Sequence, residues 1–375
     1  MNQPQSPKQP ANLDLLYTEL EDDLRSSVSA LLADKCDPHR VKALYDGDGA
    51  LGEELWPALA GELGLAGLLV PEDLGGAGAT TREAAVVLEE IGRYTAPVPF
   101  LTSAVVATTV LLDEHATEAA RALVGELAAG EKTAALLVPF SFGPDTDLAR
   151  AAVSGGTQVR SVAGALEADV LLVPVAVDGG LEIRAVAASS ATVDPVVSLD
   201  MSRPLADVTL AEVTGDVVVP AGSGNQAVRR ALLTGAALLA SEQLGVAQWC
   251  LTTTLAYLKE RRQFGRVLGG FQALKHRLAD MFAAVESAGA SARYAAAALA
   301  AGEDEEIATR VAASFCSETA LDAAEDAIQL HGGIGMTWEH SAHHYLKRAK
   351  SSHIALGTPG AHRAALADLV ELPAS

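Results

Sequence analysis

The feature that most limits the possible folds of this chain is a residue periodicity that changes twice along its length. From Leu13 to about Gly130, apolar residues recur at three- and four-residue spacing, which predicts helices. From about residue 134 to Pro220 the apolar segments are short, rich in Val and bounded by Gly, Asp and Pro. That pattern predicts the strands of a small antiparallel sheet or barrel. Helical periodicity then returns and continues to Leu372.

The order helices, strands, helices shows no βαβ alternation, which argues against a parallel Rossmann sheet. A chain of 375 residues is also longer than one hydrophobic core usually supports. We therefore expect a mainly α protein with a middle β domain. The expected parts are a disordered tail (1–12), an N-terminal helical domain (13–133), a middle β domain (134–220) and a C-terminal helical bundle (222–375).

Charge and composition exclude several classes of partner and site. The formal net charge of −21 argues against nucleic acid and anionic membranes as partners, because both require a basic face. The three cysteines are far apart and show no C-x-x-C spacing, so neither a disulfide framework nor a zinc site is predicted. The N-terminus lacks a secretory signal, and polar residues interrupt the most apolar stretch (231–258). We expect a cytoplasmic protein.

The first polar cluster of the C-terminal half reads KERRQFGRVLGGFQALKHRLADM (259–281). On a helix, Arg261 and Phe264 would share a face, because they are three residues apart. The Arg261 guanidinium could then bind phosphate while Phe264 packs a flat surface beside it. Gly269-Gly270 is predicted to break the helix, and Gln272 to begin the next one. A helix end with a solvated basic turn would explain the same residues without a ligand.

The second cluster reads AIQLHGGIGMTWEH (327–340). Three glycines within four positions would allow backbone to approach a ligand closely. A simpler explanation makes Gly332 a helix C-cap and Gly335 a turn residue. Four histidines (331, 340, 343 and 344) lie near this end of the chain, but no clear ligand set accompanies them, so no metal is predicted.

Taken together and in this order, the two clusters resemble the C-terminal motifs of the flavin-dependent acyl-CoA dehydrogenase family. The stretch LWPALAGELGLAGLLVPEDLGGAGA (55–79), followed by AAVVLEEIGR (84–93), resembles the family's N-terminal helical domain. The resemblance covers nearly the whole chain. It implies an N-terminal helical domain, a β-barrel-like middle domain and a C-terminal four-helix bundle through which subunits associate.

The resemblance also implies FAD as the cofactor. In the family, the R-x-x-F motif, the Gln eleven residues after its Arg, and the Q-x-x-G-G segment contact FAD held mainly by a neighbouring subunit. They reach the pyrophosphate and adenine across the subunit interface, where the histidines would be flavin-side or surface residues. The corresponding residues of this chain are Arg261, Phe264, Gln272, Gln329, Leu330, His331, Gly332 and Gly333.

The residues that carry out the family's reaction are missing. That reaction is α,β-dehydrogenation of an acyl-CoA thioester, in which a Glu removes the α-proton and the β-hydrogen leaves as hydride to the flavin. The Glu usually belongs to an E-G-T triplet, which aligns with Leu356-Gly357-Thr358. Some members carry it instead on a helix, at the position assigned here to Thr234, which Gly235 follows. No catalytic residue is therefore predicted.

The flavin-ring contacts of the middle domain are replaced as well. The family's T-E-P-x-A-G-S-D-like and W-I-[TS]-N segments cradle the ring. The corresponding regions here read VPFSFGPDTDLARAAVSGGTQV (138–159) and ADVLLVPVAVDGG (168–180). Neither family motif is present in them.

These features resemble the degenerate subunit of an actinobacterial heteromeric α2β2 acyl-CoA dehydrogenase, notably those of steroid side-chain degradation. The resemblance implies a homologous catalytic partner that binds most of the acyl-CoA, with electron-transfer flavoprotein as the acceptor. One alternative is a self-sufficient homotetramer whose displaced base is Glu242, if burial in an apolar helix raises the pKa of that carboxyl. A bond from Glu242 to a neighbouring helix would explain the same residue. Another alternative is a flavin-free scaffold of the same fold.

Overall fold

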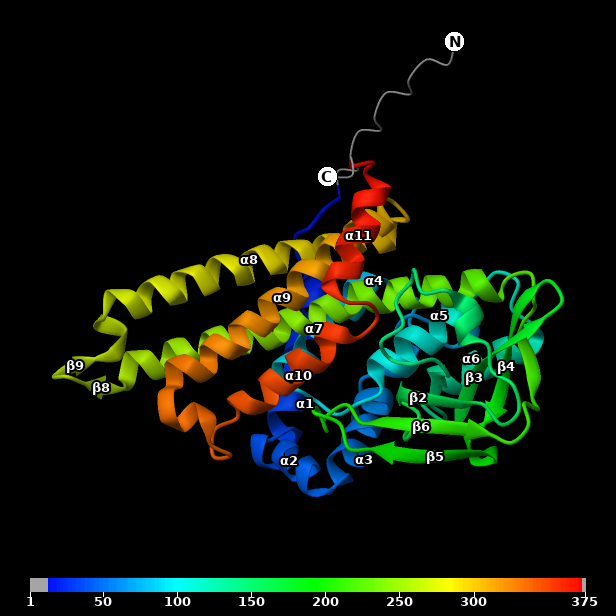
Figure 1. The fold of residues 1–375 in the computed structure, drawn as a ribbon, viewed down its shortest axis with the longest axis horizontal. Helices are drawn as coiled ribbons and strands as arrows, with labels where there is room; N and C mark the ends of the chain where they lie inside the picture. The colour runs from blue at the N-terminus through cyan, green and yellow to red at the C-terminus, as the bar shows by residue number, and fades with distance from the viewer. Residues whose placement is uncertain (1–12, 373–375) are drawn as a thin grey trace, which may run out of the picture.

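The computed structural model describes residues 13–372 and shows three parts (Figure 1). The tail expected at residues 1–12 lies outside the described residues. Thr18 and Thr80 each form a capping box, with Glu21 and Glu83 respectively, and so fix where two of the first helices begin. The N-terminal helices are α1 (Glu19–Lys35), α2 (Pro38–Ala43), α3 (Ala50–Pro57), α4 (Thr81–Tyr94), α5 (Thr108–Leu111) and α6 (Glu118–Ala128), with a π-helical turn η5 (Phe100–Ala107) before α5.

The middle part contains two sheets, of order β1-β3-β4-β7 and β2-β6-β5. The pairs are antiparallel as predicted, except that β1 runs parallel to β3. Asp178-Gly179 forms the two-residue turn between β3 and β4, a turn sequence typical of hairpins. Seven strands make up the two sheets: β1 (Ala134–Leu136), β2 (Gln158–Ala163), β3 (Val170–Val177), β4 (Gly180–Ala187), β5 (Ala191–Val196), β6 (Leu205–Leu210) and β7 (Asp216–Val219).

The C-terminal part is a helical bundle around the 37-residue helix α7. The helices α10 and α11 follow one another along α9, so together they complete the bundle beside α7 and α8 (Figure 1). The bundle core is built largely from buried alanines. Its helices are α7 (Gly224–Glu260), α8 (Gln272–Ala301), α9 (Glu305–His331), α10 (Ala342–Ile354) and α11 (Pro359–Leu369).

Two glycines bring the N-terminal helices into backbone contact with the bundle. A Cβ on Gly92 of α4 would lie 2.0 Å from the carbonyl oxygen of Glu242 in α7. A Cβ on Gly245 of α7 would lie 1.9 Å from the carbonyl oxygen of Glu89 in α4. Only glycine permits this approach, so the backbones of α4 and α7 are in direct contact at these two positions.

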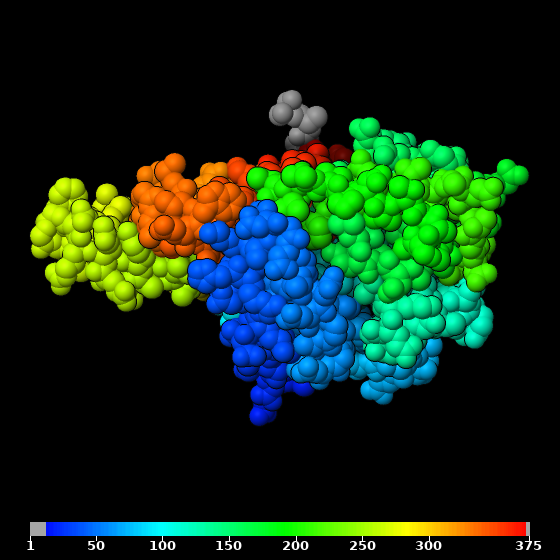
Figure 2. Space-filling view, turned by 90° about the horizontal axis from the view of Figure 1, so that it is seen from below, coloured from blue at the N-terminus to red at the C-terminus, as the bar shows by residue number. Residues whose placement is uncertain are grey.

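The molecule is elongated, and the end of α7 with the start of α8 projects at one extremity (Figure 2, yellow). There a two-stranded hairpin, β8 (Arg262–Gln263) and β9 (Arg266–Val267), connects α7 to α8 through the turn η8 (Leu268–Gly270). Within residues 13–372, no helix combines the length and the apolar character that crossing a bilayer requires.

Candidate functional site

Leu356, which the sequence comparison aligns with the family's E-G-T triplet, lies in the turn between α10 and α11. It is 3% exposed and adopts a left-handed conformation, with φ of 52°. Thr358 caps α11, since its hydroxyl accepts the N–H of Ala361. His362 binds the Leu356 carbonyl oxygen through Nε2 at 3.1 Å. Burial and the nearby Arg310 lower the pKa of His362 to about 4, so the ring is neutral and Nε2–H is the donor.

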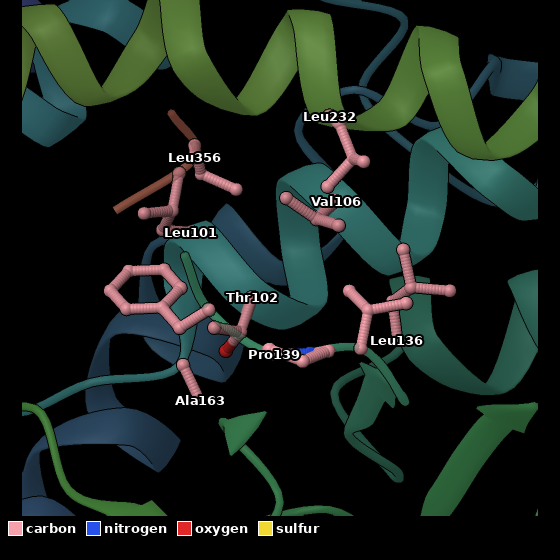
Figure 3. Close-up of a pocket in the computed structure, with 10 residues that line it drawn as sticks. Leu101, Thr102, Val106, Leu136, Pro139, Ala163, Leu232 and Leu356 are labelled. Carbon is pink, nitrogen blue, oxygen red and sulfur yellow. The ribbon is translucent and has the colours of Figure 1, made fainter. Parts of the chain in front are cut away.

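The Leu356 side chain closes an apolar cavity of only about 30 Å³ (Figure 3). Ligand pockets are typically about 300–1,000 Å³, and a single water occupies roughly 30 Å³ of liquid. None of the described residues that line the cavity has an ionisable side chain. Neither an isoalloxazine ring nor a thioester would fit. The lining residues are Leu101, Thr102, Val106, Leu136, Val138, Pro139, Phe140, Ala163, Leu232 and Leu356.

The helix position facing Leu356 is Gly235 rather than Thr234. A Cβ on Gly235 would lie 3.0 Å from Cδ1 of Leu356 and 2.9 Å from Cγ2 of Val106. Thr234 instead lines a separate cleft beside Arg230. Leu356 therefore packs against α7 at Gly235, in the space that a larger side chain at position 235 would occupy.

Residues 139–147, here named the 139–147 loop, belong to the segment predicted to replace the family's flavin cradle, and they are bonded directly to the C-terminal bundle. The carbonyl oxygen of Phe140 accepts the Leu356 N–H at 2.8 Å. The carbonyl oxygen of Pro144 accepts from Nη1 of Arg229 at 2.8 Å, and Asp145 forms an ion pair with Arg310 at 2.6 Å. A Cβ on Gly143 would lie 3.0 Å from Cα of Gly357. The middle part and the bundle thus meet without space for a ring between them.

The first predicted FAD-contact cluster lies on the exposed hairpin, not on a helix. α7 ends at Glu260, so the shared helical face predicted for Arg261 and Phe264 is wrong. Arg261 is extended, and Phe264 and Gly265 form the hairpin turn with φ of 52° and 76°. Two successive positive φ values match a type I′ turn, in which phenylalanine is unusual. Gln272 begins α8, as predicted, and is exposed.

The hairpin is an exposed basic and aromatic tip on a strongly acidic chain. Phe264 is 88% exposed, with its ring 6.2 Å from that of Phe271. Arg261 is exposed and forms no ion pair with any residue in the described range 13–372. Arg262 and Arg266 add positive charge to the same turn. An arginine with free donors beside an exposed aromatic ring is suited to a diphosphate with a planar base.

The second predicted cluster lies where α9 ends. Gln329, Gly332 and Gly333 are exposed, whereas the side chains of Leu330 and His331 are buried. Gly332 is the C-cap with φ of 65°, as predicted. Added Cβ atoms on Gly332 and Gly333 would meet nothing within 4 Å. Packing within this chain therefore gives no reason for glycine at 333, and an external group could approach its backbone closely.

The buried histidine is held by neighbours on α7 and α9. His331 donates from Nδ1 to the carbonyl oxygen of Ala327 at 2.7 Å, and its ring lies 4.5 Å from that of Tyr257. The Tyr257 hydroxyl donates to the carbonyl oxygen of His331 at 3.3 Å. Any contact of Leu330 and His331 with a cofactor would therefore have to use their backbone.

Glu242 is not a candidate base. It is 1% exposed and forms ion pairs with Arg203, from the middle part, and Arg348, from α10. Burial alone would raise the pKa of Glu242, but the two guanidinium groups outweigh it and hold that pKa below its ordinary value. The displaced-base alternative requires a raised pKa for Glu242, and that prediction is wrong. The bond to a neighbouring helix is present, through Arg348.

Comparisons with known proteins match both helical parts of the chain. Models of the acyl-CoA dehydrogenase N-terminal and C-terminal domains match residues 18–131 and 222–370. Acyl-CoA dehydrogenase IpdE2 of Mycobacterium tuberculosis is 36% identical over 90% of this chain and 92% of its own length.

Two similar solved structures each contain two different chains. A variant of the Tcur3481–Tcur3483 steroid acyl-CoA dehydrogenase is 29% identical, with a TM-score of 0.82 over 94% of this chain and 98% of that one. The ChsE4–ChsE5 complex from Mycobacterium tuberculosis is 25% identical, with a TM-score of 0.83 over 96% of this chain and all of that one (100%).

Proposed function

Because this chain belongs to the acyl-CoA dehydrogenase family, we propose that it is the non-catalytic subunit of a heteromeric FAD-dependent member. The observation that carries the proposal is the small size of the cavity beside Leu356. Leu356 and the 139–147 loop leave a cavity of about 30 Å³ where the family's reaction would need a carboxylate and a flavin ring. A leucine accepts no proton, and the α-proton of a thioester requires a positioned base.

The exposed residues of the hairpin and of the segment after α9 suggest what this chain contributes to a complex. Arg261, Phe264 and Gln272 at the hairpin, with Gln329 and the glycine backbone after α9, would bind the diphosphate and adenine of an FAD held mainly by the partner. When bound there, FAD supplies the hydride acceptor. The residues of this chain would only orient the nucleotide, while the partner would provide the base and most of the acyl-CoA site.

The relatives favour a particular partner and substrate class. Two of the similar solved structures are pairs of different chains, and one of them is described as a steroid acyl-CoA dehydrogenase. We therefore propose an α2β2 complex with a homologous catalytic chain. Its substrate would be a steroid side-chain CoA ester, and an electron-transfer flavoprotein would be its electron acceptor in the cytoplasm.

Co-expression with a homologous chain that carries an intact E-G-T or helix glutamate tests the proposal. This chain purified alone should be colourless, and the complex should show flavin absorbance near 450 nm and oxidise acyl-CoA. Arg261→Ala should release flavin from the assembled complex, while Lys350→Ala, a charge removal on α10, should not.

Flavin and turnover from this chain alone, or full partner activity without it, would contradict the proposal. A colourless, assembled complex would favour the scaffold alternative. Glu242→Gln should leave turnover per assembled complex unchanged, because that carboxylate is enclosed by Arg203 and Arg348.

A further inference from the structure

A cleft of about 530 Å³ lies between the N-terminal helices and the middle part. One wall comes from α3 and the turn before it, and the other comes from the loops that precede β3 and β6. The helix α3 lies beside the middle part in both views of the molecule (Figure 1 and Figure 2). The cleft shares no lining residue with the cavity at Leu356. Its volume is typical of small-molecule pockets, which span about 300–1,000 Å³.

The inner surface of the cleft is mainly apolar and partly preformed. Leu44, Trp56 and Met201 contribute large side chains to it. Four prolines, whose rings fix φ, stiffen three separate segments of the wall. A preformed apolar wall lowers the entropy cost of binding an apolar molecule. The prolines are Pro57, Pro97, Pro99 and Pro204.

The indole of Trp56 has a donor without an acceptor. The residue is 9% exposed, and its Nε1–H forms no hydrogen bond with any residue of the described range 13–372. Buried donors are nearly always bonded, because an unmet donor costs free energy. A molecule bound in the cleft, or a water that it traps, would supply the acceptor. The unmet donor is thus a second indication of a ligand.

Three carboxylates line the cleft without a balancing cation. Asp48 and Glu53 lie on the side of α3, and Glu167 lies on the side of the middle part. None of them forms an ion pair within residues 13–372. No lysine, arginine or histidine of this described range lines the cleft. Negative charge on both sides favours a cation in the space between them.

Glu167 is the carboxyl whose ionisation the cleft changes most. Burial of the carboxyl group raises the pKa of Glu167 to about 7, although the residue as a whole keeps part of its surface exposed. No charged neighbour among the described residues contributes to that shift. A cation bound beside Glu167 would therefore be its first ionic partner and would favour the ionised carboxylate.

We propose that this cleft binds a small organic cation, in which an ammonium group is attached to an apolar body. The apolar body packs against Trp56 and the prolines, and the ammonium group binds the Glu167 carboxylate. Polyanionic CoA is repelled by the three carboxylates, so this is not a site for an acyl-CoA. The site goes beyond the proposed heteromeric function and does not depend on it.

The test compares three probes of equal chain length by isothermal titration calorimetry of the purified chain. Octylamine is a cation at neutral pH, octanol is uncharged and octanoate is an anion. Octylamine should bind at least about tenfold more tightly than octanol, and octanoate should bind most weakly. Glu167→Gln should remove most of the preference for octylamine. Glu167→Lys should reverse the preference, so that octanoate binds more tightly than octylamine.

Two controls establish where the probe binds. Glu212→Gln neutralises an exposed carboxylate of the middle part that does not line the cleft, and it should bind octylamine like the unsubstituted chain. With Trp249 and Trp338 replaced by Phe, Trp56 is the only indole of the chain. Its fluorescence should change as octylamine binds. Circular dichroism melting of each variant should show that the fold is retained.

Three results would overturn the inference. Equal affinities for the three probes would show apolar adsorption without recognition of charge. An octylamine affinity that Glu167→Gln leaves unchanged would place the cation elsewhere. Absence of octylamine binding would show that the cleft does not take an organic cation. None of these results bears on flavin binding by the co-expressed complex, so the proposed function is tested separately.

Discussion

A single side chain, Leu356, fills the position where we propose that the catalytic base is absent, and it packs the centre of the fold. We predict that Leu356→Glu will not create an active centre. The new carboxylate would lie among Leu101, Val106 and Leu232, in a lining that contains no cation, so burial would raise its pKa and destabilise the fold by several kcal/mol. The variant alone should melt at a lower temperature and remain colourless.

Leu356→Met is the control, because a swap that conserves volume costs less than about 1.5 kcal/mol in a core. Yellow Leu356→Glu protein that oxidises acyl-CoA by itself would contradict the prediction and show that the cavity opens. Equal melting temperatures for the Glu and Met variants would contradict the packing argument.

Residue identity could be predicted from the sequence more reliably than residue environment. The proposed absence of a base rests on the identity of Leu356 in its triplet, because proton abstraction depends on which side chain is present. A bond from Glu242 to a neighbouring helix was one of the predictions, but the residues that form its bonds were not predictable. Its partners Arg203 and Arg348 lie 39 and 106 residues away along the chain, so local helix pattern carries no information about them. The shared face of Arg261 and Phe264 failed because a hairpin turn replaced the expected helix.

At the scale of the elements, two glycines of the segment after α9 make opposite predictions. We expect Gly333→Ala to leave the stability of the isolated chain unchanged, because its Cβ would meet nothing within 4 Å. The same substitution should reduce flavin retention in the complex, since a methyl group would stand where nucleotide approaches. Gly335→Ala should instead lower the melting temperature, because its Cβ would lie 2.6 Å from the carbonyl oxygen of Ile328.

Differential scanning fluorimetry of the chain and flavin absorbance of the complex would separate the two effects. Unchanged flavin content in a Gly333→Ala complex would remove the case for backbone contact at that position. A stable Gly335→Ala chain would show that the turn can relax.

Most elements were predictable from periodicity, and the exceptions have physical causes. Strand β5 does not follow from the Val-rich pattern of the middle part, since its Asp194 and Pro195 are poor strand formers that an edge strand tolerates. The parallel pairing of β1 with β3 was not predicted either. It depends on β2 leaving for the second sheet, which is a choice of tertiary packing.

At the scale of the whole molecule, a buried cluster of four charges joins the middle part to the bundle. Arg348 binds Asp200 at 2.7 Å and Glu242 at 2.9 Å, and Glu242 also pairs with Arg203. We predict that Glu242→Gln will destabilise the chain by about 3–5 kcal/mol near neutral pH, because Arg203 would be left buried without its carboxylate. Urea denaturation at several pH values would measure this.

The pH dependence has a definite sign. Burial would raise the pKa values of Asp200 and Glu242, but the two arginines hold both below their ordinary values. The unfolded chain therefore binds more protons than the folded one near pH 4, and this stability is present above about pH 4.3 and lost as the pH falls below it. The difference between Glu242→Gln and the unsubstituted chain should shrink in that acid range.

Glu126→Gln, which removes an exposed ion pair with Lys132, is the control and should leave the free energy of unfolding nearly unchanged at every pH. A Glu242→Gln penalty that stays constant down to pH 3 would show that the cluster does not set the acid limit of the fold.

The contact between the 139–147 loop and the turn at Leu356 also limits how such a chain could evolve. Regaining a solitary enzyme would demand a carboxylate, a vacated ring space and a released Phe140–Leu356 bond, and each step taken singly weakens the protein before it helps. Under the proposed heteromeric function, loss of the partner's gene could not be repaired by one substitution in this chain, so the two genes would be retained together.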